Sequence, residues 1–126
     1  MPNKTNENSI KGERAMTQGF VAQYAAEAAI ATPGVFGLDS SSIITLKESL
    51  VGEHEGKGVL VDFNDNKEGL VSITVFPILY YGNVIPEVAW SIQERVKNDV
   101  EKFTGLIVEA VNVHVKGVIL QDETHK

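Results

Sequence analysis

The strongest constraint on the fold is a change of hydrophobic period in the second half of the chain, from two to about 3.6 and back to two. Apolar and polar residues alternate over residues 58–64 and 70–78, and the polar turn Asp65–Gly69 separates the two runs. Alternation on both sides of a short turn predicts a β-hairpin. Apolar residues then recur at intervals of three to four from Val88 to Phe103, which predicts one face of a helix. Alternation returns over residues 106–116 and predicts a third strand.

The predicted helix between the hairpin and the last strand has clear boundaries. Pro86 suits the first turn of a helix, and Glu87 follows in the turn where the helix dipole favours a carboxylate. Gly105 suits the left-handed position that ends a helix. Because strand–helix–strand units connect in a right-handed sense, we expect the last strand to lie parallel to the strand at residues 70–78.

A first helix is predicted from Thr17, a plausible N-cap, to about Ala31, where Thr32 precedes a proline. Only Glu27 carries a charge in this segment. A helix so poor in charge is usually covered on more than one side. One helical stripe holds its expected buried residues, which are Phe20, Val21, Tyr24, Ala25, Ala28 and Ala29.

The remaining segments complete the predicted organisation. Residues 1–16 are polar and lack periodicity, so we expect a disordered tail, then one domain over residues 17–120 and a second tail at 121–126. Residues 39–51 suit either a short helix, which we favour, or an irregular strand. The predicted class is α+β in two layers, in the order helix, short helix, β-hairpin, helix and strand. Its small mixed sheet would be covered on one face by the helices.

Composition excludes several chemistries. Eleven basic against seventeen acidic residues give a formal net charge of −6, which disfavours binding to nucleic acid through bulk charge. The absence of cysteine excludes disulfides, thiolate zinc sites and a thiol nucleophile. No apolar run approaches the roughly 20 residues that a membrane-spanning helix needs. The N-terminus also lacks the apolar core of a secretory signal, so we expect a cytoplasmic protein without direct membrane insertion.

His114 is the titratable residue in the most suggestive position, because it lies on the polar face of the last strand between Asn112 and Lys116. Catalysis needs several convergent groups, and neither neighbour is a carboxylate. A half-exposed structural histidine is therefore the favoured interpretation. We expect no enzymatic activity, and no metal site or cofactor is implied.

The same polar face and several aromatic residues are candidates for partner contacts. Trp90 lies off the main apolar stripe of its helix, where a position at the rim of the core is favoured over an exposed anchor for a partner. The full candidate surface comprises Tyr24, Glu27, Tyr81, Trp90, Asn112, His114 and Lys116. The element order is also similar to nucleic-acid-binding KH domains, but no Gly-x-x-Gly loop joins two helices here, so this is the weaker alternative.

Several short motifs occur together in one order. They are Ala31-Thr32-Pro33-Gly34-Val35, Gly58-Val59-Leu60-Val61, Tyr81-Gly82-Asn83-Val84-Ile85-Pro86-Glu87-Val88, Gln93-Glu94-Arg95-Val96, Thr104-Gly105-Leu106 and Val111-Asn112-Val113-His114-Val115. This set resembles the alkaline shock proteins of Gram-positive bacteria, also called envelope stress response proteins, over about residues 17–117. The motifs fall mostly on turns, caps and core positions, so the resemblance indicates a fold more than a site.

The resemblance implies a small cytoplasmic α+β protein without catalytic residues or cofactor. Members of the family respond to alkaline or envelope stress, and some gather at the inner face of the membrane through a separate anchored partner. We therefore expect a non-enzymatic, self-associating scaffold of the envelope stress response. The alternative is a regulatory module that binds a metabolic enzyme, since some members are linked to the control of fatty-acid synthesis.

Overall fold

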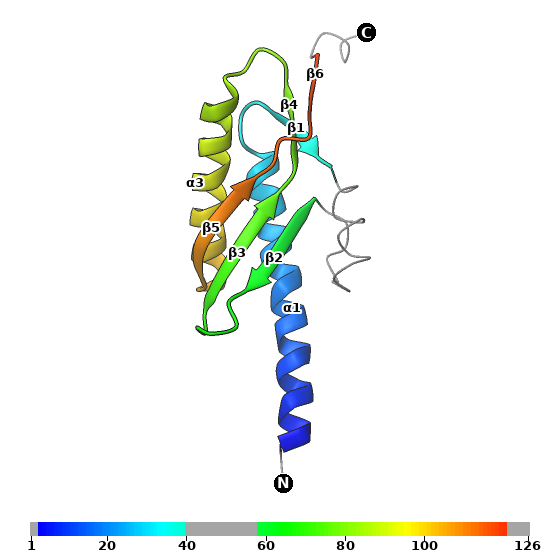
Figure 1. The fold of residues 1–126 in the computed structure, drawn as a ribbon, viewed down its shortest axis with the longest axis vertical. Helices are drawn as coiled ribbons and strands as arrows, with labels where there is room; N and C mark the ends of the chain where they lie inside the picture. Colours follow the sequence, from blue (N-terminus) through cyan, green and yellow to red (C-terminus); the bar gives the residue numbers. More distant parts are fainter. Residues whose placement is uncertain (1–2, 40–57, 121–126) are drawn as a thin grey trace.

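The computed structural model describes the backbone of residues 3–39 and 58–120, with side chains from residue 17 onward. Two helices and six strands form an α+β fold over these residues, as predicted (Figure 1). In chain order the elements are α1 (Asn3–Ile30), β1 (Val35–Leu38), β2 (Val59–Phe63), β3 (Leu70–Val75), β4 (Pro77–Tyr80), α3 (Ile85–Thr104), β5 (Ile107–Val113) and β6 (Gly117–Ile119).

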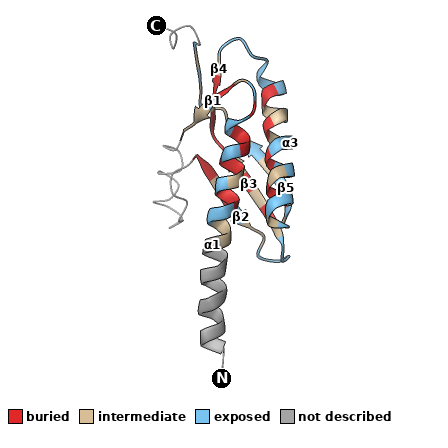
Figure 2. Ribbon diagram, turned by 180° about the vertical axis from the view of Figure 1, so that it is seen from behind, coloured by how far each residue is buried: buried red, intermediate tan, exposed pale blue. Residues whose placement is uncertain are grey.

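The strands form two three-stranded sheets instead of the single sheet expected. One has the order β2-β3-β5 and the other β1-β4-β6. Both helices lie on the same face of the β2-β3-β5 sheet, as the views from the front and from behind show (Figures 1 and 2). The predicted hairpin is confirmed, because β2 and β3 are antiparallel with Val61 opposite Ile73. The predicted crossover is also confirmed, because β5 is parallel to β3 with Val111 opposite Ile73.

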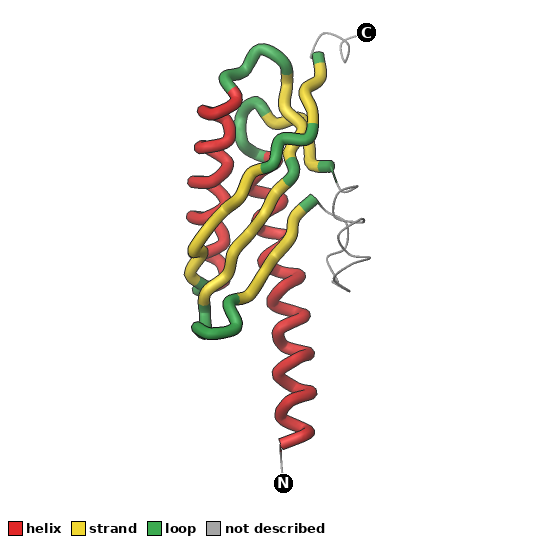
Figure 3. The backbone as a smooth tube through the Cα atoms, in the orientation of Figure 1, coloured by secondary structure: helices red, strands yellow, loops and turns green. Residues whose placement is uncertain are grey.

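The second sheet arises because both long predicted strands are interrupted at the same level (Figure 3). The run predicted as one strand over residues 70–78 stops at Val75 and restarts as β4 at Pro77. Proline has no N–H to donate, so a regular strand ladder is interrupted at that position. The last strand likewise ends at Val113 and continues as β6. Backbone hydrogen bonds hold the two interruptions together, from His114 N to Val75 O at 2.9 Å and from Lys116 N to Pro77 O at 2.8 Å.

The first helix starts earlier than predicted. It begins at Asn3 instead of Thr17, so residues 3–16 form helix where a disordered tail was expected. This part of α1 extends beyond the β2–β3 hairpin (Figure 1). The predicted start at Thr17 relied on the apolar face of the helix, and an apolar face decides how a helix packs. Extending an existing helix, however, costs far less free energy than nucleating one, and it needs no apolar face.

The core lies between the two helices and the inner face of the β2-β3-β5 sheet (Figure 2). The sheet contributes mainly β-branched residues such as Val59, Val71 and Ile73, all fully buried. Small residues of α1, among them Ala25 and Ala29, allow its backbone to approach closely. The predicted stripe of α3 is buried at Val88, Ile92, Val96 and Val100. At the ends of the predicted stripes, Phe20 and Phe103 are more than half exposed, at 52% and 54%, contrary to expectation.

Two short strands were missed, and one predicted segment is not described. β1 has only four residues and includes Gly37, so it carries little periodicity, and its antiparallel pairing with β4 contains a register shift. β6 has three residues and pairs in parallel with β4. The short helix expected over residues 39–51 lies almost entirely outside the described residues.

Candidate interaction surfaces

The turn from β4 into α3 leaves apolar side chains facing outward. Gly82 adopts a positive φ of 101°, and Asn83 Nδ2 donates a hydrogen bond to Tyr80 O at 3.0 Å. This turn sets the direction of α3. We define the α3-entry patch as five exposed large apolar residues of this turn, of α3 and of β6, which are Tyr81, Val84, Ile85, Trp90 and Val118.

Four members of the α3-entry patch line two shallow hollows. Tyr81, Ile85 and Val118 line one of them, and Pro86 and Trp90 line the other with Glu87 and Ser91. Ile85 and Pro86, one from each hollow, are consecutive in the chain. Tyr81 is 69% exposed and Trp90 62% exposed. The patch is therefore a largely apolar surface with the carboxylate of Glu87 at its margin.

The exposure of Trp90 corrects our favoured interpretation of this residue as part of the core rim. Each residue of a helix turns about 100°, so Trp90 points roughly 200° away from buried Val88. The spacing that separates Trp90 from the buried stripe was visible in the sequence. The prediction instead followed the general rule that large aromatic residues are mostly buried, and Trp90 is an exception to that rule.

Tyr24 and Glu27 lie on α1 and have different surroundings. The ring of Tyr24 stacks on that of Phe103 with centroids 5.0 Å apart, and it lines a hollow with Phe20. Much of the Tyr24 ring is therefore already in contact with residues of the same chain. Glu27 is exposed and accepts a hydrogen bond from Gln23 Nε2 at 3.3 Å. As expected, α1 is covered on more than one side, by α3 and by strands of the sheet. A stripe that includes Phe20, Gln23, Glu27 and Ile30 remains exposed.

Asn112, His114 and Lys116 are exposed on the outer side of β5 and the segment after it. They alternate with the partly buried valines at 111, 113 and 115, as predicted. The amide of Asn112 donates to Thr74 Oγ1 at 3.4 Å, and the His114 ring lies 5.6 Å from that of Phe76, centroid to centroid. Within residues 17–39 and 58–120, no group of three histidine or carboxylate side chains is arranged to hold a metal ion. Neither α1 nor α3, over its described length, combines the length and apolarity that a bilayer crossing requires.

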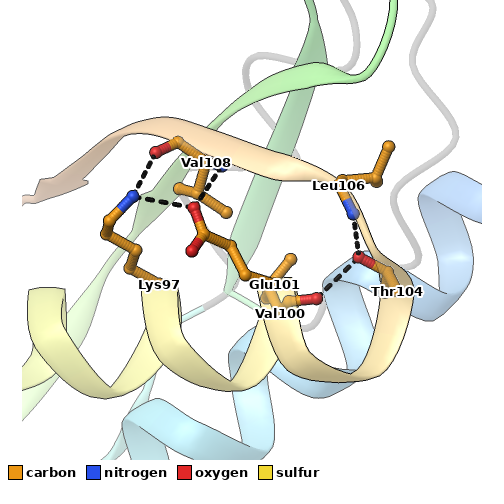
Figure 4. Close-up of polar contacts among 6 residues, drawn as sticks. All are labelled: Lys97, Val100, Glu101, Thr104, Leu106 and Val108. Carbon is orange, nitrogen blue, oxygen red and sulfur yellow. Dashed lines mark hydrogen bonds and ion pairs between the residues drawn. The ribbon is translucent and has the colours of Figure 1, made fainter.

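A set of contacts between α3 and β5 was not predicted (Figure 4). Lys97 Nζ lies 2.7 Å from Glu101 Oε2 and donates to Val108 O at 3.0 Å. Glu101 Oε2 also accepts the Val108 N–H at 2.9 Å. Gln93 Nε2 donates to Val111 O at 3.0 Å. No contact was predicted for these residues, and their spacing of four along α3 was the available signal.

The hydrogen bond from Lys97 and then that from the Val108 N–H lower the pKa of Glu101 below its ordinary value of 4.5. Since the folded-state pKa is the lower one, the carboxylate stabilises the fold above pH 4.5. That stabilisation is lost as the pH falls through the lowered pKa. The contact between α3 and β5 is therefore at full strength near neutral pH.

Comparison with known proteins adds a family match. The model of the alkaline shock protein 23 family, described as having a cell envelope-related function, matches residues 6–120. The uncharacterized protein YloU of Bacillus subtilis is 34% identical over 110 residues, covering 85% of this chain and 88% of YloU. The uncharacterized protein Spy1614 of Streptococcus pyogenes is 38% identical over 87 residues, covering 68% of this chain and 69% of Spy1614.

Among solved structures, the zinc form of MamM CTD D249N is similar at a TM-score of 0.45 and 16% sequence identity. The match covers 77% of this chain and 81% of that one. A second form, MamM-CTD H285A, matches at a TM-score of 0.44 and 16% identity, covering 77% of this chain and 92% of the other.

Proposed function

This chain belongs to the alkaline shock protein 23 family of cell envelope-related function, and on that premise we propose that it is a non-enzymatic interaction protein. In this proposal it associates with itself and is recruited to the inner face of the membrane by a partner protein in the envelope stress response. The family match confirms the resemblance inferred from the motifs. The observation that carries the proposal is the α3-entry patch.

The composition of the α3-entry patch supports a contact between proteins. Tryptophan and tyrosine are enriched among the residues that dominate binding energies at protein interfaces. Trp90 and Tyr81 are the two most exposed large hydrophobic residues among those described. An apolar patch needs no oppositely charged partner. The same patch on a second copy, related by a two-fold axis, is therefore a chemically suitable occupant.

The polar face of Asn112, His114 and Lys116 suits a different kind of contact. Its hydrogen-bonding groups are exposed, and no large apolar side chain is among them. In this proposal the polar face meets the recruiting partner, while the α3-entry patch joins copies of the chain. The two surfaces can thus be tested separately.

The test of self-association is the mass in solution, measured by light scattering over a concentration series. The parent chain should associate with rising concentration. The double variant Trp90→Ala/Tyr81→Ala should associate at least about tenfold more weakly, since losing such anchors commonly costs more than 1 kcal/mol each. Phe20→Ala is the matched control, because it removes an aromatic of similar exposure from α1. A monomeric parent, or a double variant that associates like the parent, contradicts the proposal.

The test of recruitment is affinity capture of the tagged chain from detergent-solubilised cells, with identification of co-purified proteins. Recovery of a membrane protein that is lost in Asn112→Ala/His114→Ala/Lys116→Ala supports the proposal. Recovery of a soluble enzyme of lipid synthesis would instead favour the regulatory alternative. Recovery of RNA would favour the KH-like alternative.

A further inference from the structure

The β5 strand is an edge of its sheet in the part of the chain that the structure describes, since the order is β2-β3-β5. An edge strand presents unpaired N–H and C=O groups, which form a template for pairing with another chain. The β5 sequence, IVEAVNV, is rich in β-branched residues, and these favour strand pairing. The edge of β5 is therefore the place where a second copy of this chain could add its own β5 and extend the sheet.

Side chains of α3 bond three backbone groups of β5. The N–H of Val108 donates to the Glu101 carboxylate, and its carbonyl accepts from Lys97. The carbonyl of Val111 accepts from Gln93. One N–H makes one such bond, so a strand that approaches Val108 must first displace Glu101. Hydrogen bonds to charged groups are about twice as strong as neutral ones, which makes the displacement unfavourable.

The spacing and surroundings of Gln93, Lys97 and Glu101 suit them to block the pairing of another strand with β5. Residues 93, 97 and 101 recur every four positions, so they form one row along α3 that faces β5. Lys97 and Glu101 also pair with each other, and 46% and 32% of their side-chain surfaces are exposed. A register shift between β3 and β5 lies beside Val108. Such irregularities are another device by which proteins discourage edge pairing.

We propose that Gln93, Lys97 and Glu101 close the β5 edge against strand addition by a second copy of this chain. Association is thereby restricted to other surfaces, and the sheet does not extend from molecule to molecule at β5. This inference goes beyond the proposed function and does not depend on it. The edge is closed whether or not the α3-entry patch joins copies.

The test removes the side chains of Gln93, Lys97 and Glu101 and measures whether the β5 edge then pairs with a second copy. The variant Gln93→Ala/Lys97→Ala/Glu101→Ala is compared with Glu94→Ala/Asn98→Ala/Lys102→Ala. The control also removes one acidic, one basic and one amide side chain, from exposed positions one residue further along the same helix. Both carry Trp90→Ala/Tyr81→Ala, so association through the α3-entry patch does not contribute. Each also carries Ala110→Cys as the single thiol, because the chain has no cysteine.

We expect the row-deleted variant to reach the mass of a dimer or larger assembly and to cross-link through position 110 with a short bifunctional thiol reagent. The control should stay monomeric and uncross-linked. At low concentration, the amide of Val108 should exchange with solvent roughly tenfold faster or more in the row-deleted variant. A folded row-deleted variant that remains monomeric overturns the inference, and so does one that associates without cross-linking at position 110.

If the triple variant does not fold, Glu101→Ala in the Trp90→Ala/Tyr81→Ala/Ala110→Cys background provides the test. It removes the acceptor of the Val108 N–H and the partner of Lys97, and it leaves Gln93 and Lys97 in place. Faster exchange at Val108 together with concentration-dependent mass then supports the inference. Exchange or mass like that of the same background without Glu101→Ala overturns it.

Discussion

At the scale of single residues, two threonines end the two helices with the same contact. Thr32 Oγ1 donates to Ala28 O at 2.9 Å, and Thr104 Oγ1 donates to Val100 O at 2.6 Å. The last four carbonyls of a helix lack partners within the helix, and the Thr32 hydroxyl supplies one to Ala28. The Val100 carbonyl lies four residues before the last residue of α3, so the Thr104 hydroxyl adds to the helical bond there. The surroundings differ, because Thr32 is only 2% exposed whereas Thr104 is half-buried.

This difference predicts unequal effects of the same substitution. Thr32→Val keeps the shape but leaves the Ala28 carbonyl without its donor in a buried place, so the free energy of unfolding should fall by about 1–3 kcal/mol. Thr104→Val should cost about 1 kcal/mol or less, because water can replace the hydroxyl there. Urea denaturation of both variants measures the two values. Equal losses would show that burial does not decide the effect.

At the scale of elements, the start of β2 crosses the end of β1 with very little space. A Cβ built on Gly58 would lie 2.5 Å from the Cβ of Leu38, and Gly58 has a φ of 80°. Gly105, which ends α3, has nearly the same φ of 78°, with nothing within 4 Å of such a Cβ. The two glycines therefore separate the cost of a left-handed backbone from the cost of a close approach.

Alanine at these two positions should give distinct losses of stability. Gly105→Ala should cost about 1–2 kcal/mol, which is the strain of the left-handed conformation alone. Gly58→Ala should cost roughly 1–3 kcal/mol more, because the added methyl overpacks the crossing of β1 and β2. Thermal and urea unfolding of both variants compare the losses. If Gly58→Ala is no worse than Gly105→Ala, the crossing is looser than described.

At the scale of the whole molecule, two chain connections join the two sheets. β3 leads into β4, and β5 leads into β6, with the hydrogen bonds of His114 and Lys116 at the two junctions. Leu79 of the second sheet is fully buried, and it belongs to the same core cluster as Ile73 of the first. We therefore expect the two sheets to unfold as one cooperative unit.

Shortening a buried side chain in either sheet tests whether the two sheets unfold together. Ile73→Ala should lower the free energy of unfolding by about 2–5 kcal/mol, and the most protected amides of both sheets should lose protection equally. Leu79→Ala should have the same reciprocal effect. Native-state hydrogen exchange resolves the two sheets residue by residue. Protection lost in only the mutated sheet would mean that the sheets open independently.

The sequence by itself determined the hairpin, α3 and the parallel crossover to β5. These follow from local apolar spacing, from Pro86 and Gly105 at the helix ends, and from the handedness of the connection. The alternation that leaves Asn112, His114 and Lys116 outside was equally local. None of these features depends on a distant partner, which is why a single sequence was sufficient.

Only the tertiary structure decided the rest. β1 and β6 are too short to show a period and exist because β4 lies between them. The closing of the β5 edge depends on which backbone groups of β5 lie within reach of the α3 side chains. The helical period of α3 does not specify the position of β5. The exposure of Phe103, which lies on the predicted stripe, was likewise set by where neighbouring elements stop covering α3. These features depend on contacts between segments that the sequence does not place next to one another, so local pattern could not reveal them.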